Sequence, residues 1–232
     1  MERGPAAARG RAFQPSALGV IRCGASVSCS PATRVMTHHP ACQGYSLMEL
    51  MFATGMAVTM TAAAVPQYLA AIDDFRAAGA TRYISSRLQR ARMEAVVRST
   101  EVAMQFAEST GGYGYAVYRD GNRNGVLMRD IQDGIDRLIA PMEQLSEQFS
   151  GVEFGAIPGL PPVDAGGTPP GTDPVRLGAG SFASFSAAGT SSSGTVYIRS
   201  RRGAQYAVRI FGETGKTRML KFDLGTRKWR PL

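Results

Sequence analysis

A long apolar stretch dominates the hydropathy pattern of the chain. Residues Leu50–Ile72 contain no charged side chain, and as a helix they would extend over roughly 34 Å, enough to cross the hydrocarbon core of a bilayer. The pattern that follows is amphipathic, with apolar positions at helical spacing: Ile84, Leu88, Ala91 and Ala95. We therefore predict one continuous helix ending near Ser99, with a transmembrane half at 45–72 and an amphipathic half at 73–99.

Alternating patterns typical of strands follow the helix. Residues 102–107 alternate apolar with small or polar side chains, and residues 113–117 repeat this after a glycine-containing turn, which predicts a β-hairpin. A short helix is expected around Pro141–Phe149. Five more strands are predicted, at Phe182–Ser186, Gly194–Ser200, Tyr206–Phe211, Arg218–Phe222 and Arg227–Arg230. The chain is therefore expected to be α+β, with an antiparallel β-sheet head at 100–232.

Two polar segments of the head allow more than one interpretation. Asp120, Asn122 and Asn124 alternate as oxygen ligands do in a calcium loop, but the twelfth position holds Ile131 instead of the bidentate Glu. The missing ligand favours a polar turn, with calcium binding as the alternative. The Pro/Gly-rich loop at 157–173 has a length at which loops are usually functional or mobile, and the sequence does not choose between these.

The start of the apolar run carries the clearest motif in the chain. Gly44 is followed by the aromatic Tyr45, a Ser-Leu pair and, after one more residue, Glu49. A carboxylate in this position costs a few kcal/mol at most membrane depths, which indicates a function. Together with Pro66 within the run, this pattern resembles the processing site of type IV prepilins and type II secretion pseudopilins.

The resemblance implies a role for each of these residues. A prepilin peptidase would cut after Gly44 and methylate the new α-amino group of Tyr45. Glu49 would pair with that amino group on a neighbouring subunit during filament assembly, since opposite charges attract strongly at low dielectric. Pro66 would kink the helix or let it melt locally, because it frees a backbone carbonyl. The expected fold is pilin-like, with the long N-terminal helix packed on the sheet of the head.

The order of elements in the head also resembles a known group. A hairpin, an Asp/Asn-rich turn, a long loop and a C-terminal antiparallel meander are similar to the FimT/GspH group of minor pilins and pseudopilins. The most similar stretches are YRDGNRNG, SFSAAGTSSSGTVYI and TGKTRMLKFD. The resemblance implies a structural subunit made as a single-pass inner-membrane precursor of a bacterium, with its head in the periplasm and other pilins or pseudopilins as partners.

The first 44 residues are expected to be a leader. Residues 1–35 are rich in Ala, Arg, Gly, Ser and Pro and lack a sustained apolar segment, so they are not a secretory signal peptide. We expect them to be disordered, or to result from a mis-assigned start, with translation beginning at Met36. The alternative to processing after Gly44 is an uncleaved, signal-anchored periplasmic protein.

Composition excludes several kinds of active site from the processed chain. All three cysteines and both histidines precede Tyr45: Cys23, Cys29, Cys42, His38 and His39. A chain that begins at Tyr45 can therefore form no disulfide framework, no His/Cys zinc site and no Ser–His or Cys–His nucleophilic pair. We accordingly expect neither an enzyme nor a cofactor.

The C-terminal segment from Arg199 to Arg230 is strongly basic, with ten Lys or Arg residues opposed by Glu213 and Asp223. Some FimT-type pilins carry a basic Gly-Arg-x-Arg tip motif linked to DNA capture in natural transformation, and the similar stretch here is 215–218. Contacts to phosphates would fall on Lys216, Arg218, Lys221, Arg227 and Lys228. DNA binding is the alternative function, and a solvated or filament-facing basic surface is the simpler explanation.

Overall fold

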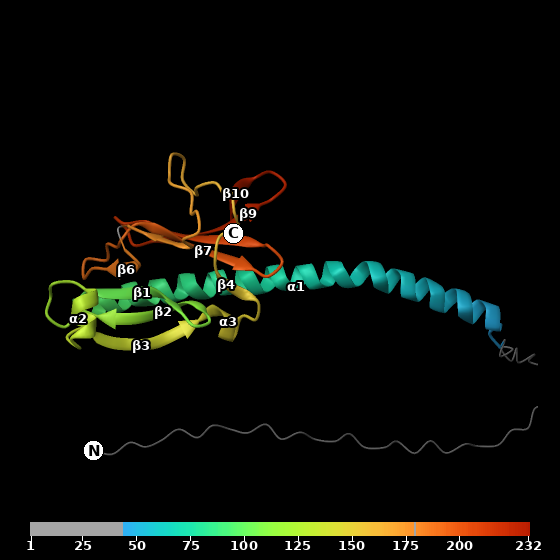
Figure 1. The fold of residues 1–232 in the computed structure, drawn as a ribbon, viewed down its shortest axis with the longest axis horizontal. Helices are drawn as coiled ribbons and strands as arrows, with labels where there is room; N and C mark the ends of the chain where they lie inside the picture. Colours follow the sequence, from blue (N-terminus) through green and yellow to red (C-terminus); the bar gives the residue numbers. More distant parts are fainter. Residues whose placement is uncertain (1–43, 179) are drawn as a thin grey trace, which may run out of the picture. The chain divides into compact units, whose positions relative to one another are not determined.

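The computed structural model describes residues 44–178 and 180–232, with a compact unit that begins at Leu47. The predicted leader, including Met36 and every cysteine and histidine, lies outside the described residues except for Gly44. Helix α1 (Leu47–Arg98) is a single helix of 52 residues, which confirms the predicted continuous helix and its end near Ser99 (Figure 1).

The second half of α1 packs into the main core of the head. The four apolar positions predicted to face inward are all buried, as are two alanines of the preceding turns: Ala77, Ala80, Ile84, Leu88, Ala91 and Ala95. Small side chains at four of these positions let the strands approach the helix closely. Glu94 and Arg98, four residues apart, form an ion pair on the exposed side of the helix.

The first sheet contains the predicted hairpin. Strand β1 (Val102–Ser109) pairs with β2 (Gly112–Arg119) in antiparallel register, and the sheet order is β3-β2-β1-β6. The outer strands are β3 (Arg137–Gln144) and β6 (Phe182–Phe185). The predicted strand at Phe182–Ser186 therefore exists, but it pairs with β1 and does not join the C-terminal meander.

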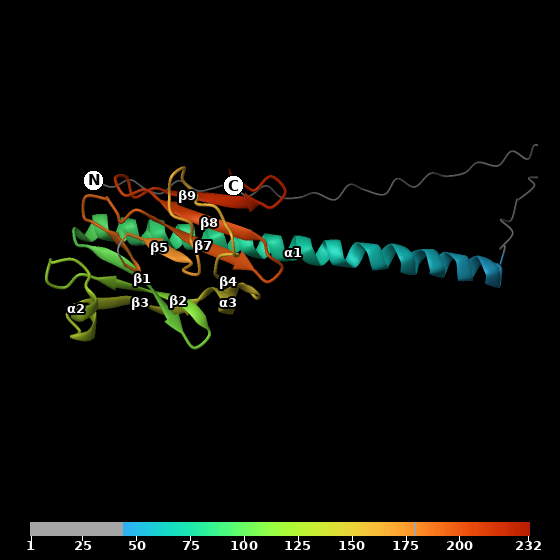
Figure 2. The ribbon, with the colours of Figure 1, turned by 45° about the horizontal axis from the view of Figure 1, so that its top comes forward.

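The second sheet contains that meander, in the order β10-β9-β8-β7-β4, and β5 shares the outer edge of β7 with β4 (Figure 2). Its strands are β4 (Val152–Phe154), β5 (Val175–Leu177), β7 (Gly194–Ser200), β8 (Gln205–Ile210), β9 (Thr217–Asp223) and β10 (Lys228–Pro231). The four C-terminal strands match the predicted ones to within a residue at each end. Helix α1 contacts strands of both sheets, and their inward-facing side chains share one core with it.

The loop at 157–173 covers the outer face of the second sheet with its first residues. Leu160 is buried there, with Ile157 and Val163 packed beside it, against a small second core formed by Tyr197, Ala207, Leu220, Phe222 and Trp229. The indole N–H of Trp229 donates a hydrogen bond to the carbonyl of Pro161 at 3.1 Å. This half of the loop therefore has a structural role, because it closes an apolar face that the sheet would otherwise expose.

The helix predicted around Pro141–Phe149 is mostly wrong. Strand β3 continues through Pro141 to Gln144, and only the short α3 (Leu145–Gln148) follows it. Because β3 is an edge strand, a proline without an N–H group can be accommodated there. The short helix α2 (Met128–Gln132) and the three-residue strands β4 and β5 were not predicted, since such short elements carry little periodicity.

Candidate functional site

The apolar half of α1 makes no buried contact with the rest of the described chain. Every residue from 44 to 71 is exposed, including large apolar side chains such as Phe52, Met60 and Tyr68. Among the described residues, α1 is the only helix long and apolar enough to cross a membrane. An apolar surface of this extent needs lipid or other apolar helices to cover it.

The threonine hydroxyls within the apolar run are satisfied inside the helix. The hydroxyls of Thr54, Thr59 and Thr61 donate to backbone carbonyls three or four residues earlier, at 2.8, 2.9 and 2.7 Å respectively. This arrangement leaves none of these three threonine hydroxyls in need of water, as an apolar environment requires. The hydropathy pattern alone did not reveal it.

The motif residues lie at the beginning of this helix. Gly44 and Tyr45 precede it, both are exposed, and Tyr45 is 80% accessible. Glu49 lies in the first turn of α1, where the helix dipole favours a negative charge. Glu49 forms no ion pair with another described residue. The helix continues through Pro66, and Figure 1 shows it curved without a break.

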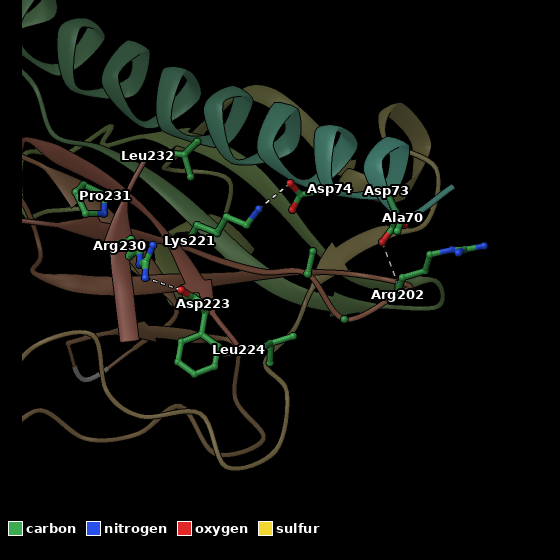
Figure 3. A pocket seen from close by; sticks show the side chains of 13 residues that line it. Ala70, Asp73, Asp74, Arg202, Lys221, Asp223, Leu224, Arg230, Pro231 and Leu232 are labelled. Carbon is green, nitrogen blue, oxygen red and sulfur yellow. Dashed lines mark hydrogen bonds and ion pairs between the residues drawn. The ribbon is translucent and has the colours of Figure 1, made fainter. Parts of the chain in front are cut away.

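The head begins where the apolar run ends. Asp73 is only 8% exposed, and its Oδ2 accepts the backbone N–H of Arg202 at 3.1 Å. Asp74 accepts a hydrogen bond from Lys221 at 2.7 Å (Figure 3) and another from the Tyr206 hydroxyl at 2.8 Å. Two successive carboxylates thus attach the turn between β7 and β8, and strand β9, to the first helical turn after Ile72.

A second polar connection fastens the first sheet to α1. The Arg87 guanidinium forms an ion pair of 2.7 Å with Glu143 of β3, and the hydroxyls of Tyr115 and Tyr83 donate to the same carboxylate at 2.6 and 2.8 Å. Burial raises the pKa of Glu143, but the hydrogen bonds from the two tyrosines and the charge of Arg87 outweigh it and hold that pKa below its ordinary value. Sequence reasoning missed this network, because its members are far apart along the chain.

The Asp/Asn segment forms a polar turn. The Asp120 carboxylate accepts the backbone N–H groups of Asn122, Arg123 and Gly125 at 3.0, 2.7 and 2.9 Å. The amides of Asn122 and Asn124 donate to Asp130. Within the described residues, no group of three or more acidic, His or Cys side chains is arranged to hold a metal ion. The hydrogen bonds of Asp120 are those expected of a polar turn.

The structure separates the five basic residues proposed for DNA binding. Gly215 is buried at φ +60°, where an added Cβ would lie 2.6 Å from the Gly189 carbonyl and 2.7 Å from the Arg92 side chain, so Lys216 follows a turn seated on α1 at Arg92. Lys221, at the other end of β9, reaches Asp74. These two attachment points are roughly 27 Å apart along α1.

Lys216 and Arg218 are exposed near the Arg92 end, and Arg218 lies directly across from Arg209 on β8. Neither forms an ion pair within the described part of the chain, whereas Arg209 pairs with Asp164 at 2.6 Å. Arg227 donates to the Gly159 carbonyl, and Lys228 is exposed beside it at the start of β10. Lys216 and Arg218 are therefore two neighbouring exposed cations whose side chains have no ion-pair or hydrogen-bond partner within the described residues, whereas Lys221 and Arg227 have partners there.

No protein-family model, curated protein or solved structure matches this chain. For the described residues, the structure establishes a long apolar helix followed by antiparallel sheets, and this helix is long and apolar enough to cross a membrane. The pilin-like assignment is accordingly a proposal, argued from the motif and from the geometry of α1.

Proposed function

We propose that the protein is a minor pilin or pseudopilin, a structural subunit of a type IV pilus or of a type II secretion pseudopilus. The single observation that carries the proposal is the division of α1 into two halves. One half is apolar and exposed along its length, while the other buries one face against the head. The processing motif lies directly before the exposed half.

A filament subunit needs both halves of α1, because each half meets a different environment. As a precursor, the apolar half spans the bacterial inner membrane once, with lipid around it and the head on the periplasmic side. In the filament, helices of sister subunits replace the lipid. Glu49 then pairs with the α-amino group of Tyr45 on a neighbour, which compensates two charges that would each be costly in an apolar surrounding.

Processing is tested by intact mass and N-terminal sequencing of membrane-extracted protein, from cells with and without their prepilin peptidase. We expect a chain beginning at N-methylated Tyr45, found only when the peptidase is present. Gly44→Val should block cleavage, whereas Gly55→Val, the same change beyond the motif, should not. A chain that keeps its leader in both strains would overturn the proposal in favour of an uncleaved signal anchor.

Assembly is tested separately through Glu49. We expect Glu49→Gln to be cleaved normally but to be lost from sheared filaments or purified pseudopili, because the neutral amide no longer compensates the neighbouring α-amino charge. Glu94→Gln is the matched control, since Glu94 lies on the exposed side of the same helix within the head and pairs only with Arg98. Equal incorporation of both variants would contradict the role of Glu49.

DNA binding by the head is a second candidate, favoured by the exposed pair Lys216 and Arg218 with Arg209 alongside. Two adjacent cations can contact the phosphates of DNA without reading its bases. Lys216→Glu/Arg218→Glu should then abolish DNA retention while assembly persists. Arg201→Glu/Arg202→Glu makes the same charge change at the other end of the head and should leave retention intact.

A further inference from the structure

The turn between β7 and β8 lies beside the last turn of the apolar run. Its backbone N–H at Arg202 bonds to Asp73, the residue directly after Ile72. One residue adds only about 1.5 Å along a helix, whereas the polar headgroup layer is roughly 5–8 Å deep on each side of the hydrocarbon core. If residues 50–72 span the bilayer, this turn lies among the headgroups.

The turn carries two adjacent arginines that are not neutralised by the head. Arg201 and Arg202 are exposed, and neither forms an ion pair within residues 44–178 and 180–232. Three other cations at this end of the head do have partners, whereas the exposed Arg76 of α1 forms no ion pair within the described residues: Arg199 pairs with Glu153 at 2.7 Å, Lys221 with Asp74 at 2.7 Å and Arg230 with Asp223 at 2.8 Å. The carboxylates of Glu153, Asp74 and Asp223 therefore already have cationic partners, and Asp73 accepts the backbone N–H of Arg202.

The two arginines line separate hollows beside the turn. Arg202 lines a hollow of about 640 Å³ that is also lined by Ala70 of the apolar run and by Leu232. Figure 3 shows its side chain extending from the Asp73 contact past Ala70. Arg201 lines a separate hollow with Gly151 and Glu153. A planar guanidinium binds phosphate oxygens through two parallel hydrogen bonds, which a lysine cannot do.

This end of the head also exposes apolar side chains. Leu224, in the turn between β9 and β10, is 60% exposed and lines the same hollow as Arg202. Phe75 is also exposed, one turn beyond the end of the apolar run. Exposed apolar and cationic groups next to a membrane helix are the combination that an interfacial surface uses.

We propose that Arg201 and Arg202 bind the phosphates of anionic phospholipids in the leaflet from which α1 emerges, and so hold the head on the bilayer before the subunit enters a filament. The inference rests on the proposed function in one respect only, that residues 50–72 span the membrane. It requires neither cleavage after Gly44 nor assembly. Its partner is a lipid surface, and its determinant is the double arginine of one turn.

The test measures hydrogen exchange of the full chain in nanodiscs of phosphatidylcholine alone or with about one third phosphatidylglycerol. Each basic residue near an anionic surface changes the equilibrium about fivefold, so amides 201–204 should exchange roughly 25-fold more slowly in the anionic discs. Arg201→Glu/Arg202→Glu should remove this difference. Lys216→Glu/Arg218→Glu, with the same change in charge at the Arg92 end, should preserve it.

The membrane anchor is monitored in the same experiment. If the amides of residues 50–72 exchange slowly but the exchange of amides 201–204 does not depend on lipid charge, the proposed docking is wrong while the membrane anchor is supported. Rapid exchange across 50–72 would overturn the anchor itself, and the docking with it. If the distal variant lost the lipid dependence as completely as the turn variant, general charge and not this turn would be responsible, which also overturns the proposal.

Discussion

The guanidinium of Arg87 lies 2.7 Å from the carboxylate of Glu143, and this ion pair joins helix α1 to the edge strand β3. Both side chains are about three-quarters buried, and Tyr83, Tyr115 and Gln148 also donate hydrogen bonds to Glu143. One carboxylate thus accepts from the helix, from β2 and from α3. The edge strand depends on it, because β3 has a strand neighbour on only one side.

Replacing this carboxylate should destabilise the head. Glu143→Ala leaves the Arg87 charge and two tyrosine hydroxyls without their acceptor, so we expect a loss of about 2 kcal/mol in the free energy of unfolding. The measurement is thermal or denaturant unfolding of the detergent-solubilised chain. Glu147→Ala, at an exposed position four residues later, should change stability by less than about 0.5 kcal/mol.

The same residue should make the head sensitive to acid. The pKa of Glu143 is lowered in the folded chain from its ordinary 4.5, because the hydrogen bonds and the Arg87 charge outweigh the effect of burial. Its stabilisation is therefore present above pH 4.5 and is lost as the pH falls through the folded pKa. Glu143→Gln should be less stable at neutral pH but should show a flatter decline in melting temperature below pH 4.5. An unchanged slope would contradict this assignment.

Two buried tyrosines should limit the stability of the fold at alkaline pH. Burial, and then hydrogen bonds to Asp74 and Glu143 respectively, raise the pKa values of Tyr206 and Tyr115 well above 10.0. An acidic group whose pKa is higher in the folded than in the unfolded chain stabilises the fold at pH values below the unfolded pKa. The free energy of unfolding should therefore decline as the pH rises above 10. Tyr206→Phe should lessen this decline, whereas Tyr118→Phe, at a tyrosine outside both networks, should not. Melting temperatures between pH 8 and 11 provide the measurement.

The buried face of α1 should tolerate little change. Leu88 is fully buried in the main core, so Leu88→Ala should cost about 3 kcal/mol through lost transfer energy and a residual cavity. Val97 is 75% exposed on the last turns of the same helix, and Val97→Ala should be nearly neutral. Equal losses for the two variants would mean that α1 does not pack on the head as described.

The outer core can be followed by fluorescence, since Trp229 is the only tryptophan in the chain. Leu160→Ala should expose the indole as the loop loosens, shift its emission to the red and cost about 2 kcal/mol. Thr168→Ala changes an exposed residue of the same loop and should leave the spectrum unchanged. If the emission of Trp229 stayed blue-shifted in Leu160→Ala, the loop would not be what covers the outer core.

Features that depend on local periodicity could be predicted from the amino-acid sequence. The apolar run, the amphipathic continuation, the hairpin and the four C-terminal strands all follow from side-chain spacing within windows of a few residues, and they match the structure closely. The motif at Gly44, Tyr45 and Glu49 is likewise a short-range signal. Its processing and its partner in a filament stay predictions.

Contacts between residues far apart in the chain could not be predicted in this way and became visible in the folded protein. Lys221 reaches Asp74 across 147 positions, and no periodicity in the sequence relates two residues that far apart. The same pairing of distant segments places β6 beside β1, separates Lys216 from Lys221 and brings Arg201 and Arg202 to the end of the apolar run. Strand pairing and burial, which depend on the whole chain, select these neighbours, and the surfaces proposed for DNA and for lipid exist only because of that selection.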